Sequence, residues 1–280
     1  MPVAVVTDST AELPADLAAT YGITVVPLLV VRDGVAGREG VDVGPADVAR
    51  VLAARGTVTT SRPAPETFRA AYRRLLADGA DAVVSVHLSA RLSGTWDAAR
   101  LAVAESPGRI EVVDTGMVGA ALGFAALAAA RTARAGGDAA AVRRAALAAA
   151  DRTAVYFCLD TLEFLRRGGR MGAAVARLGT ALSVRPILQL ADGGIVARDR
   201  VRTGSRALAR LVDLAAGAAG DGPADVVVAH LAARQRAEQV AAALAGRLAG
   251  RVGDLRVAEV GAVLAAHCGP GLTSVVVHRR

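Results

Sequence analysis

The chain of 280 residues contains no lysine, few aromatic residues and only two cysteines. Cys158 and Cys268 lie far apart and fit no spacing typical of metal ligation or thiol redox chemistry, so we expect two reduced thiols. Aromatic residues make up 3% of the chain, which argues against aromatic platforms that stack nucleic acid bases. The four histidines show no spacing that predicts a metal site.

Because lysine is absent, all 33 basic residues are arginine, and the formal net charge is +7. GC-rich codon usage explains this loss of lysine more simply than a functional choice does. The arginines are spread along expected helices with acidic residues between them, so we expect no nucleic acid partner and keep DNA binding as the weakest alternative. A basic surface also favours transient contact with an anionic membrane surface or an acidic partner.

No apolar run is long enough to span a bilayer, although 53% of the residues are hydrophobic. The longest, residues 117–130, is short and interrupted by glycine. The N-terminus leads directly into the apolar residues 3–6, which indicate a strand rather than a signal peptide. We therefore expect a soluble, cytoplasmic protein.

Strand-like and helix-like segments alternate along the chain, which predicts an α/β fold with a parallel sheet covered on both faces. The pattern changes near residue 152. We expect two lobes with a ligand between them: an N-terminal Rossmann-like parallel-sheet domain of residues 1–152 and a C-terminal mixed-sheet domain of residues 153–280. Expected strands include 23–31 and a hairpin turning at 192–194; 34–44 and 57–65 are expected loops, and 173–182 a helix.

Four loops rich in hydroxyl groups and glycine carry the strongest functional signal. They are Thr7-Asp8-Ser9-Thr10, Thr60-Ser61-Arg62-Pro63, Leu92-Ser93-Gly94-Thr95 and His267-Cys268-Gly269-Pro270-Gly271. Three of the four follow an apolar run, and ligands of α/β proteins bind where loops leave the strand ends. Neutral hydroxyls, backbone N–H groups and one imidazole suit a small anion such as a carboxylate better than bond cleavage.

Ser93 stands where a helix is expected to start, and a helix N-terminus offers unpaired N–H groups to an anion. Gly94 allows the backbone to approach a ligand closely, whereas Ser93 or Thr95 acting only as a helix cap is the alternative. The Gly-Pro-Gly turn after residue 268 is stiff and would fix the direction of the His267 imidazole.

Other catalytic motifs are absent. The chain has no Gly-x-Ser-x-Gly elbow, no P-loop and no Gly-x-Gly-x-x-Gly after the first strand. Asp8 lacks the second aspartate of a phosphatase motif, because Thr10 occupies that position. A Ser93–His267 pair acting as a hydrolase or acyltransferase remains the alternative function, although no carboxylate stands out as its third member.

Six short stretches, in this order along the whole chain, resemble the DegV family of FakB-type fatty-acid-binding proteins. They are residues 7–13, Thr60-Ser61-Arg62-Pro63-Ala64, Leu92-Ser93-Gly94-Thr95, residues 162–170, Arg185-Pro186-Ile187-Leu188 and His267-Cys268-Gly269-Pro270-Gly271. The chain departs from the family at Arg62-Pro63-Ala64, where Gln-Pro-Ser is usual, and at Arg185, where lysine is usual.

The resemblance implies a non-catalytic, lipid-binding subunit that needs no cofactor and no metal. A long-chain fatty acid would lie between the lobes, its carboxylate held by Thr60, Ser93 and His267, with Gly94 and Thr95 beside them. A separate ATP-dependent fatty acid kinase would convert the presented acid to acyl-phosphate for phospholipid synthesis. Arg170 and Arg202 are the matching candidates for the contact with the kinase.

An aliphatic interior suits this ligand. A sixteen-carbon chain gains roughly 0.8 kcal/mol for each buried CH2 group, on the order of 10 kcal/mol in total before costs. We expect its tunnel to be lined by the segments 173–182, 187–190 and 25–29.

Overall fold

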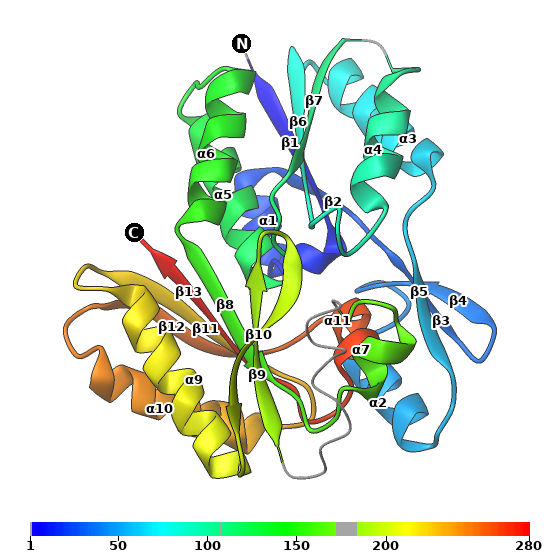
Figure 1. Ribbon diagram of the computed structural model, residues 1–280. Helices are drawn as coiled ribbons and strands as arrows, with labels where there is room; N and C mark the ends of the chain where they lie inside the picture. Colours follow the sequence, from blue (N-terminus) through cyan, green and yellow to red (C-terminus); the bar gives the residue numbers. More distant parts are fainter. Residues whose placement is uncertain (1, 107, 172–183) are drawn as a thin grey trace.

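The computed structural model describes residues 2–106, 108–171 and 184–280 and contains three sheets. The first is parallel, has the strand order β2-β1-β6-β7, and is drawn at the top of Figure 1. Its strands are β1 (Val3–Asp8), β2 (Ile23–Val26), β6 (Ala82–His87) and β7 (Arg109–Asp114). All six residues of β6 are buried, as expected for a strand covered on both faces.

Helices cover both faces of this sheet. Val5 and Val84 pack towards one group of helices, and Val6 and Val83 towards the other. The first group contains α1 (Ala15–Tyr21), α5 (Ala120–Arg134) and α6 (Ala139–Asp151), and the second α3 (Pro65–Ala77) and α4 (Thr95–Val103). The predicted parallel sheet is therefore confirmed.

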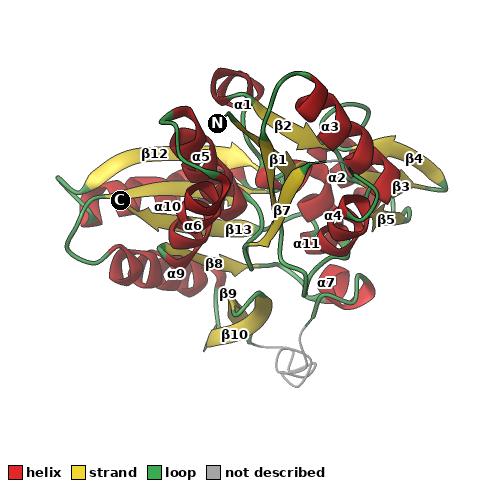
Figure 2. Cartoon of the chain, turned by 90° about the horizontal axis from the view of Figure 1, so that it is seen from above, coloured by secondary structure: helices red, strands yellow, loops and turns green. Residues whose placement is uncertain are grey.

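The second sheet is mixed and has the order β10-β9-β8-β13-β11-β12. Its strands are β8 (Thr153–Cys158), β9 (Arg185–Ala191), β10 (Gly194–Val201), β11 (Ala224–His230), β12 (Val252–Glu259) and β13 (Thr273–Arg279). One face packs against α9 (Gly204–Ala219) and α10 (Arg234–Arg247), and Figure 1 shows α5 and α6 above the other. Figure 2 gives the view from above. The mixed sheet and the hairpin turning at 192–194 are confirmed.

A third, antiparallel sheet was not predicted. It has the order β4-β3-β5 and consists of β3 (Leu29–Arg32), β4 (Val35–Arg38) and β5 (Val58–Ser61). The expected strand 23–31 is wrong because Pro27, which has no N–H to donate, separates β2 from β3. The expected loops 34–44 and 57–65 are also wrong, since each contains a strand that pairs with β3.

Three short helical elements complete the centre of the molecule, together with α2 (Pro45–Ala53). They are the 3-10 turn η1 (Ser9–Ala11), α7 (Glu163–Arg167) and α11 (Ala262–Cys268). Leu28 and Val30 pack in the same core as Val263 of α11, so the third sheet joins residues after 152. The boundary at residue 152 stays a prediction, and the expected helix 173–182 lies outside the described residues. Among the helices that the structure describes, none has the length and apolarity to cross a membrane.

Gly123 in α5 tests how closely this helix packs on η1. A Cβ there would lie 2.6 Å from the carbonyl oxygen of Ala11, so Gly123→Ala should destabilise the fold by about 1–3 kcal/mol. The matched control is Gly217→Ala in α9, where a Cβ meets nothing within 4 Å. That change should stabilise by about 0.5–1 kcal/mol, because alanine favours a helix. Urea unfolding measures both, and equal effects would contradict the packing described.

Candidate functional site

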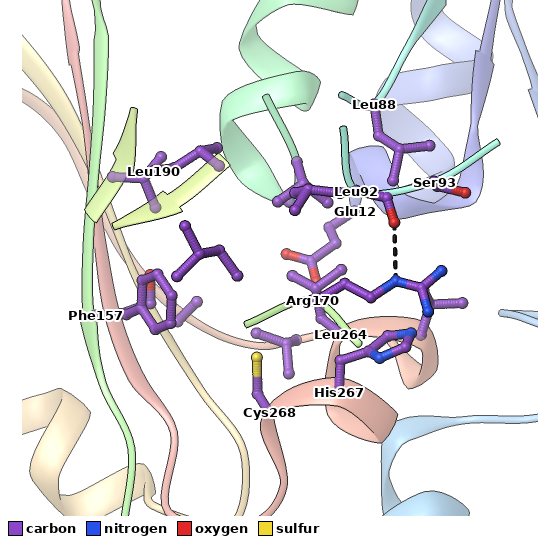
Figure 3. Close-up of a pocket in the computed structure, with 18 of the residues that line it drawn as sticks. Glu12, Leu88, Leu92, Ser93, Phe157, Arg170, Leu190, Leu264, His267 and Cys268 are labelled. Atoms are coloured by element: carbon purple, nitrogen blue, oxygen red, sulfur yellow. Dashed lines mark hydrogen bonds between the residues drawn. The ribbon is translucent and has the colours of Figure 1, made fainter. Parts of the chain in front are cut away.

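A deep pocket lies between the loops of the first sheet and the inner face of the second sheet (Figure 3). The empty space inside it, counted together with its open mouth, is about 990 Å³. Its wall consists mainly of aliphatic side chains. These are Leu28, Leu88, Leu92, Val118, Ala120, Val155, Leu165, Leu190, Ile195, Ala229, Val260, Val263, Leu264, Leu272 and Val276.

The second sheet supplies the pocket floor by strand alternation. Ser274 and Val276 of β13 face the pocket, whereas Val275 and Val277 pack in the opposite core under α9 and α10. Phe157 of β8 is the one aromatic residue among the described lining. The segments 187–190 and 25–29 were predicted to line the tunnel, and Leu190 and Leu28 do.

The polar end of the pocket contains a hydrogen bond between Thr60 and His267. The Thr60 hydroxyl, at the end of β5, lies 2.8 Å from Nε2 of His267 at the end of α11. Burial and the neighbouring Arg170 guanidinium lower the pKa of His267 from 6.5 to about 4, so the ring is neutral at physiological pH. The two residues are 207 positions apart in the sequence, and the fold alone brings them together.

The surroundings of the ring favour one tautomer. Nδ1 of His267 is buried and has no hydrogen-bond partner among the described residues. Because an unpaired N–H is less tolerated than an unpaired acceptor, the ring proton is best placed on Nε2, where it is donated to Thr60. The Thr60 hydroxyl proton is then available to a ligand. A methyl on Gly168 would overlap Nδ1, so glycine is required there for the ring to keep this position.

Ser93 lies in the loop immediately before α4. Its hydroxyl is 2.9 Å from the Thr95 hydroxyl and accepts the Thr95 backbone N–H at 3.3 Å. Ser93 therefore accepts the first N–H of α4 and also lines the pocket, while Thr95 is fully buried and is not among the pocket residues. Gly94 is also outside the lining, and a Cβ on it would lie 2.6 Å from Nη1 of Arg62.

Two arginines line the polar end. Arg170 donates from Nε to the Leu92 carbonyl at 2.9 Å, the dashed bond in Figure 3, and from Nη1 to the Gly168 carbonyl. Arg62 donates to the Gly94 carbonyl at 3.3 Å. Of the two predicted kinase contacts, Arg170 is thus at the pocket, whereas Arg202 is exposed after β10 and does not line it. The sequence pointed to Arg62 only as a departure from the family pattern.

A catalytic Ser93–His267 pair has no support in this geometry. His267 bonds to Thr60 through Nε2, and no carboxylate of the described residues reaches its other nitrogen. The requirements of a triad, a base bonded to the nucleophile and an acid that orients the base, are both missing.

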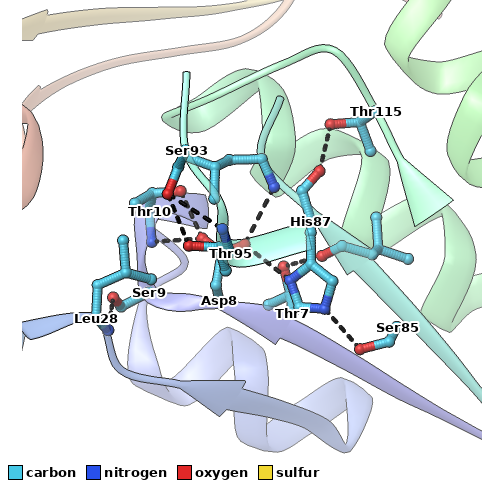
Figure 4. A network of polar contacts seen from close by, with 12 residues as sticks. Thr7, Asp8, Ser9, Thr10, Leu28, Ser85, His87, Ser93, Thr95 and Thr115 are labelled. Atoms are coloured by element: carbon cyan, nitrogen blue, oxygen red, sulfur yellow. Dashed lines mark hydrogen bonds and ion pairs between the residues drawn. The ribbon is translucent and has the colours of Figure 1, made fainter. Parts of the chain in front are cut away.

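A serine–histidine–aspartate chain does exist elsewhere, but it is inaccessible (Figure 4). Asp8 Oδ2 lies 2.9 Å from His87 Nδ1, and His87 Nε2 lies 2.7 Å from the Ser85 hydroxyl, which accepts from Tyr72 at 2.8 Å. All four residues have no exposed surface. Asp8 also accepts the Leu88 backbone N–H at 3.1 Å, so this network fixes a loop that lines the pocket.

Sequence reasoning missed Glu12 and Cys268 as pocket residues. Glu12 accepts the Gly261 backbone N–H at 2.7 Å, and burial raises its pKa from 4.5 to about 8. Burial likewise raises the pKa of the Cys268 thiol to about 12, so that it is neutral. Both residues stand in stretches that resemble the DegV family, residues 7–13 and 267–271, but the motifs gave neither of them a role.

These features define an α/β protein with a deep apolar pocket that ends in hydroxyls, an imidazole and two guanidiniums. The chain belongs to the DegV family: the family model described as "Uncharacterised protein, DegV family" matches residues 2–280. A DegV domain-containing protein of Streptomyces coelicolor is 53% identical over 278 residues, which is 99% of both chains. One of Mycobacterium bovis is 44% identical over 99% of this chain and 97% of its own.

Solved structures of the family share the whole fold. A fatty-acid-binding DegV family protein of Thermus thermophilus has a TM-score of 0.91 and 35% identity, covering 100% of both chains. DegV of Bacillus subtilis, described as a fatty acid binding protein, has a TM-score of 0.91 and 30% identity over the same coverage.

The low pKa of His267 is directly measurable. We expect its ring nitrogens to titrate near pH 4 rather than 6.5 in NMR spectra. Because the folded-state pKa lies below the unfolded one, its contribution to stability is complete above pH 6.5 and is lost as the pH falls towards 4. The unfolding free energy of His267→Gln should therefore depend less on pH in this window. A ring that titrates near its ordinary value would refute the buried, neutral imidazole.

Proposed function

We propose that this protein binds one long-chain fatty acid, with its carboxylate held by Thr60, Ser93 and His267. The observation that carries the proposal is an aliphatic pocket that ends at the Thr60–His267 hydrogen bond. The two relatives described as fatty-acid-binding proteins support it, because they share the fold over the full chain.

The energetics of the pocket agree with an acyl ligand. Each CH2 group transferred from water to this wall contributes about 0.8 kcal/mol. A carboxylate placed in such surroundings without hydrogen bonds would cost several kcal/mol. The Thr60 and Ser93 hydroxyls supply donors, and the Arg62 and Arg170 guanidiniums supply positive charge beside them.

The carboxylate end is the end that reaches the surface. Ser61 and Arg62 line the pocket and are exposed, whereas the opposite wall consists of buried strand residues. A ligand bound in this direction has its reactive group accessible to a second protein. We therefore propose that the chain presents the fatty acid, in the cytoplasm, to a separate ATP-dependent kinase that forms acyl-phosphate for phospholipid synthesis, and does not itself catalyse this step. Arg170 and Arg202 are the proposed kinase contacts.

Thr60→Val tests the carboxylate contact, because valine keeps the branched shape and removes only the hydroxyl. We expect palmitate to bind about ten-fold more weakly, the effect of losing one hydrogen bond to a charged group. The control is Thr59→Val on the exposed side of the same strand, which should bind as the wild type does. Native mass spectrometry of the purified protein, before and after denaturation, identifies the bound acid.

The opposite result is equally informative. In that case the wild-type protein carries no fatty acid, takes up none, and reacts at Ser93 with a fluorophosphonate. That result would contradict fatty acid binding and support the alternative function, a hydrolase.

Arg202→Ala separates presentation from binding. Since Arg202 is exposed and outside the pocket, its loss should leave palmitate affinity unchanged and slow phosphorylation by the kinase at least several-fold. Arg144→Ala, which removes an exposed arginine of α6, is the matched control and should change neither. Equal slowing in both variants would assign the effect to net charge rather than to this position.

A further inference from the structure

Glu12 is an ionisable side chain in the wall of a pocket that is otherwise mainly aliphatic, and the proposed carboxylate site does not use it. In Figure 3 its carboxyl group projects between the polar end, marked by Ser93 and His267, and the apolar end, marked by Phe157 and Leu190. Its backbone has the left-handed value φ 52, which is uncommon outside glycine, and Glu12 is the residue at which the 3-10 turn η1 ends.

Only one of the two carboxyl oxygens has a structural role. Oε1 accepts the Gly261 N–H at the start of α11. No N–H or O–H of the described residues donates to Oε2. A methyl on Gly119 would lie 3.4 Å from Oε2 and 3.3 Å from Cδ2 of Leu264, and both residues line the pocket. Oε2 therefore faces the space that an acyl chain would fill.

Capping alone does not explain this placement. Glu39 caps the same end of α11, accepting the Val263 N–H at 2.7 Å and the Ser9 hydroxyl at 2.5 Å, so both of its oxygens are bonded. Glu39 does not line the pocket. The two carboxyl groups thus share one structural task, and only Glu12 has a polar atom left over inside the cavity.

An unsubstituted CH2 group lying against Oε2 would displace water and leave a buried polar atom unpaired. A hydroxyl at the same place both donates and accepts, so it satisfies the carboxyl group in either ionisation state. Burial raises the pKa of Glu12 to about 8, so the neutral form is available to donate at physiological pH.

We propose that Glu12 is a specificity-determining residue: Oε2 binds a hydroxyl group carried within the acyl chain, so that the pocket prefers a fatty acid monohydroxylated at one position over the unsubstituted acid. The proposal rests on fatty acid binding as the function of the pocket. It adds a second polar contact, distinct from the carboxylate site at Thr60 and His267.

The test is a competition assay on the delipidated full chain with stearate and a positional series of monohydroxystearates. We expect the wild type to bind one isomer about ten-fold tighter than stearate. Glu12→Met should remove this preference and bind stearate a few-fold tighter, because the wall becomes apolar. Glu12→Gln, which keeps a donor and an acceptor, should retain the preference.

Glu39→Gln is the matched control, because it changes the second cap of α11 without changing the pocket wall; its ratio of affinities should equal that of the wild type. Loss of the preference in Glu39→Gln as well would attribute it to the position of α11 and overturn the proposal. So would a wild type without isomer preference, or a preference that persists in Glu12→Met. If the wild type binds neither stearate nor any hydroxystearate, the proposed function itself fails.

Discussion

The position of the short helix α11 is the constraint on which the pocket depends. Seven residues are too few to form a stable helix alone, so α11 is held from outside. Carboxyl groups of Glu12 and Glu39, more than 220 positions away in sequence, accept N–H groups at its start, at Gly261 and Val263. Its other end then places His267 against Thr60. The contacts that hold distant parts of the chain together at α11 therefore also position the polar end of the pocket.

For the proposed carboxylate ligand, this arrangement divides recognition between two kinds of group. The imidazole is neutral and acts on Thr60 by orienting its hydroxyl. Positive charge comes from Arg170 and Arg62, whose guanidiniums are themselves fixed by backbone carbonyls. A site built this way orients a carboxylate by hydrogen bonds while the arginines lower the cost of its charge.

The sequence was most informative about features encoded by short stretches of neighbouring residues. Loops after parallel strands had to gather at one edge, and Ser93 does line the pocket there. The six short stretches, in order along the chain, were together specific enough to indicate the family. The third sheet was missed, although Asp33-Gly34 is a strong hairpin signal that connects β3 to β4. Thr60 consequently lies in a strand rather than in a loop. Glu12 is held at the pocket by its hydrogen bond from the Gly261 N–H, and no local pattern encodes a contact across 249 positions.

The alternation along β13 has a consequence for how such proteins diverge. Ser274 and Val276 line the pocket, and their neighbours Val275 and Val277 pack in the core beneath α9. The strand therefore carries two independent sets of side chains on alternate residues, one on each face of the sheet. Substitutions can change the side chains that face the pocket, one at a time, while the side chains that pack the sheet against its helices stay the same. A single scaffold can in this way supply a cell with several pockets of different shape.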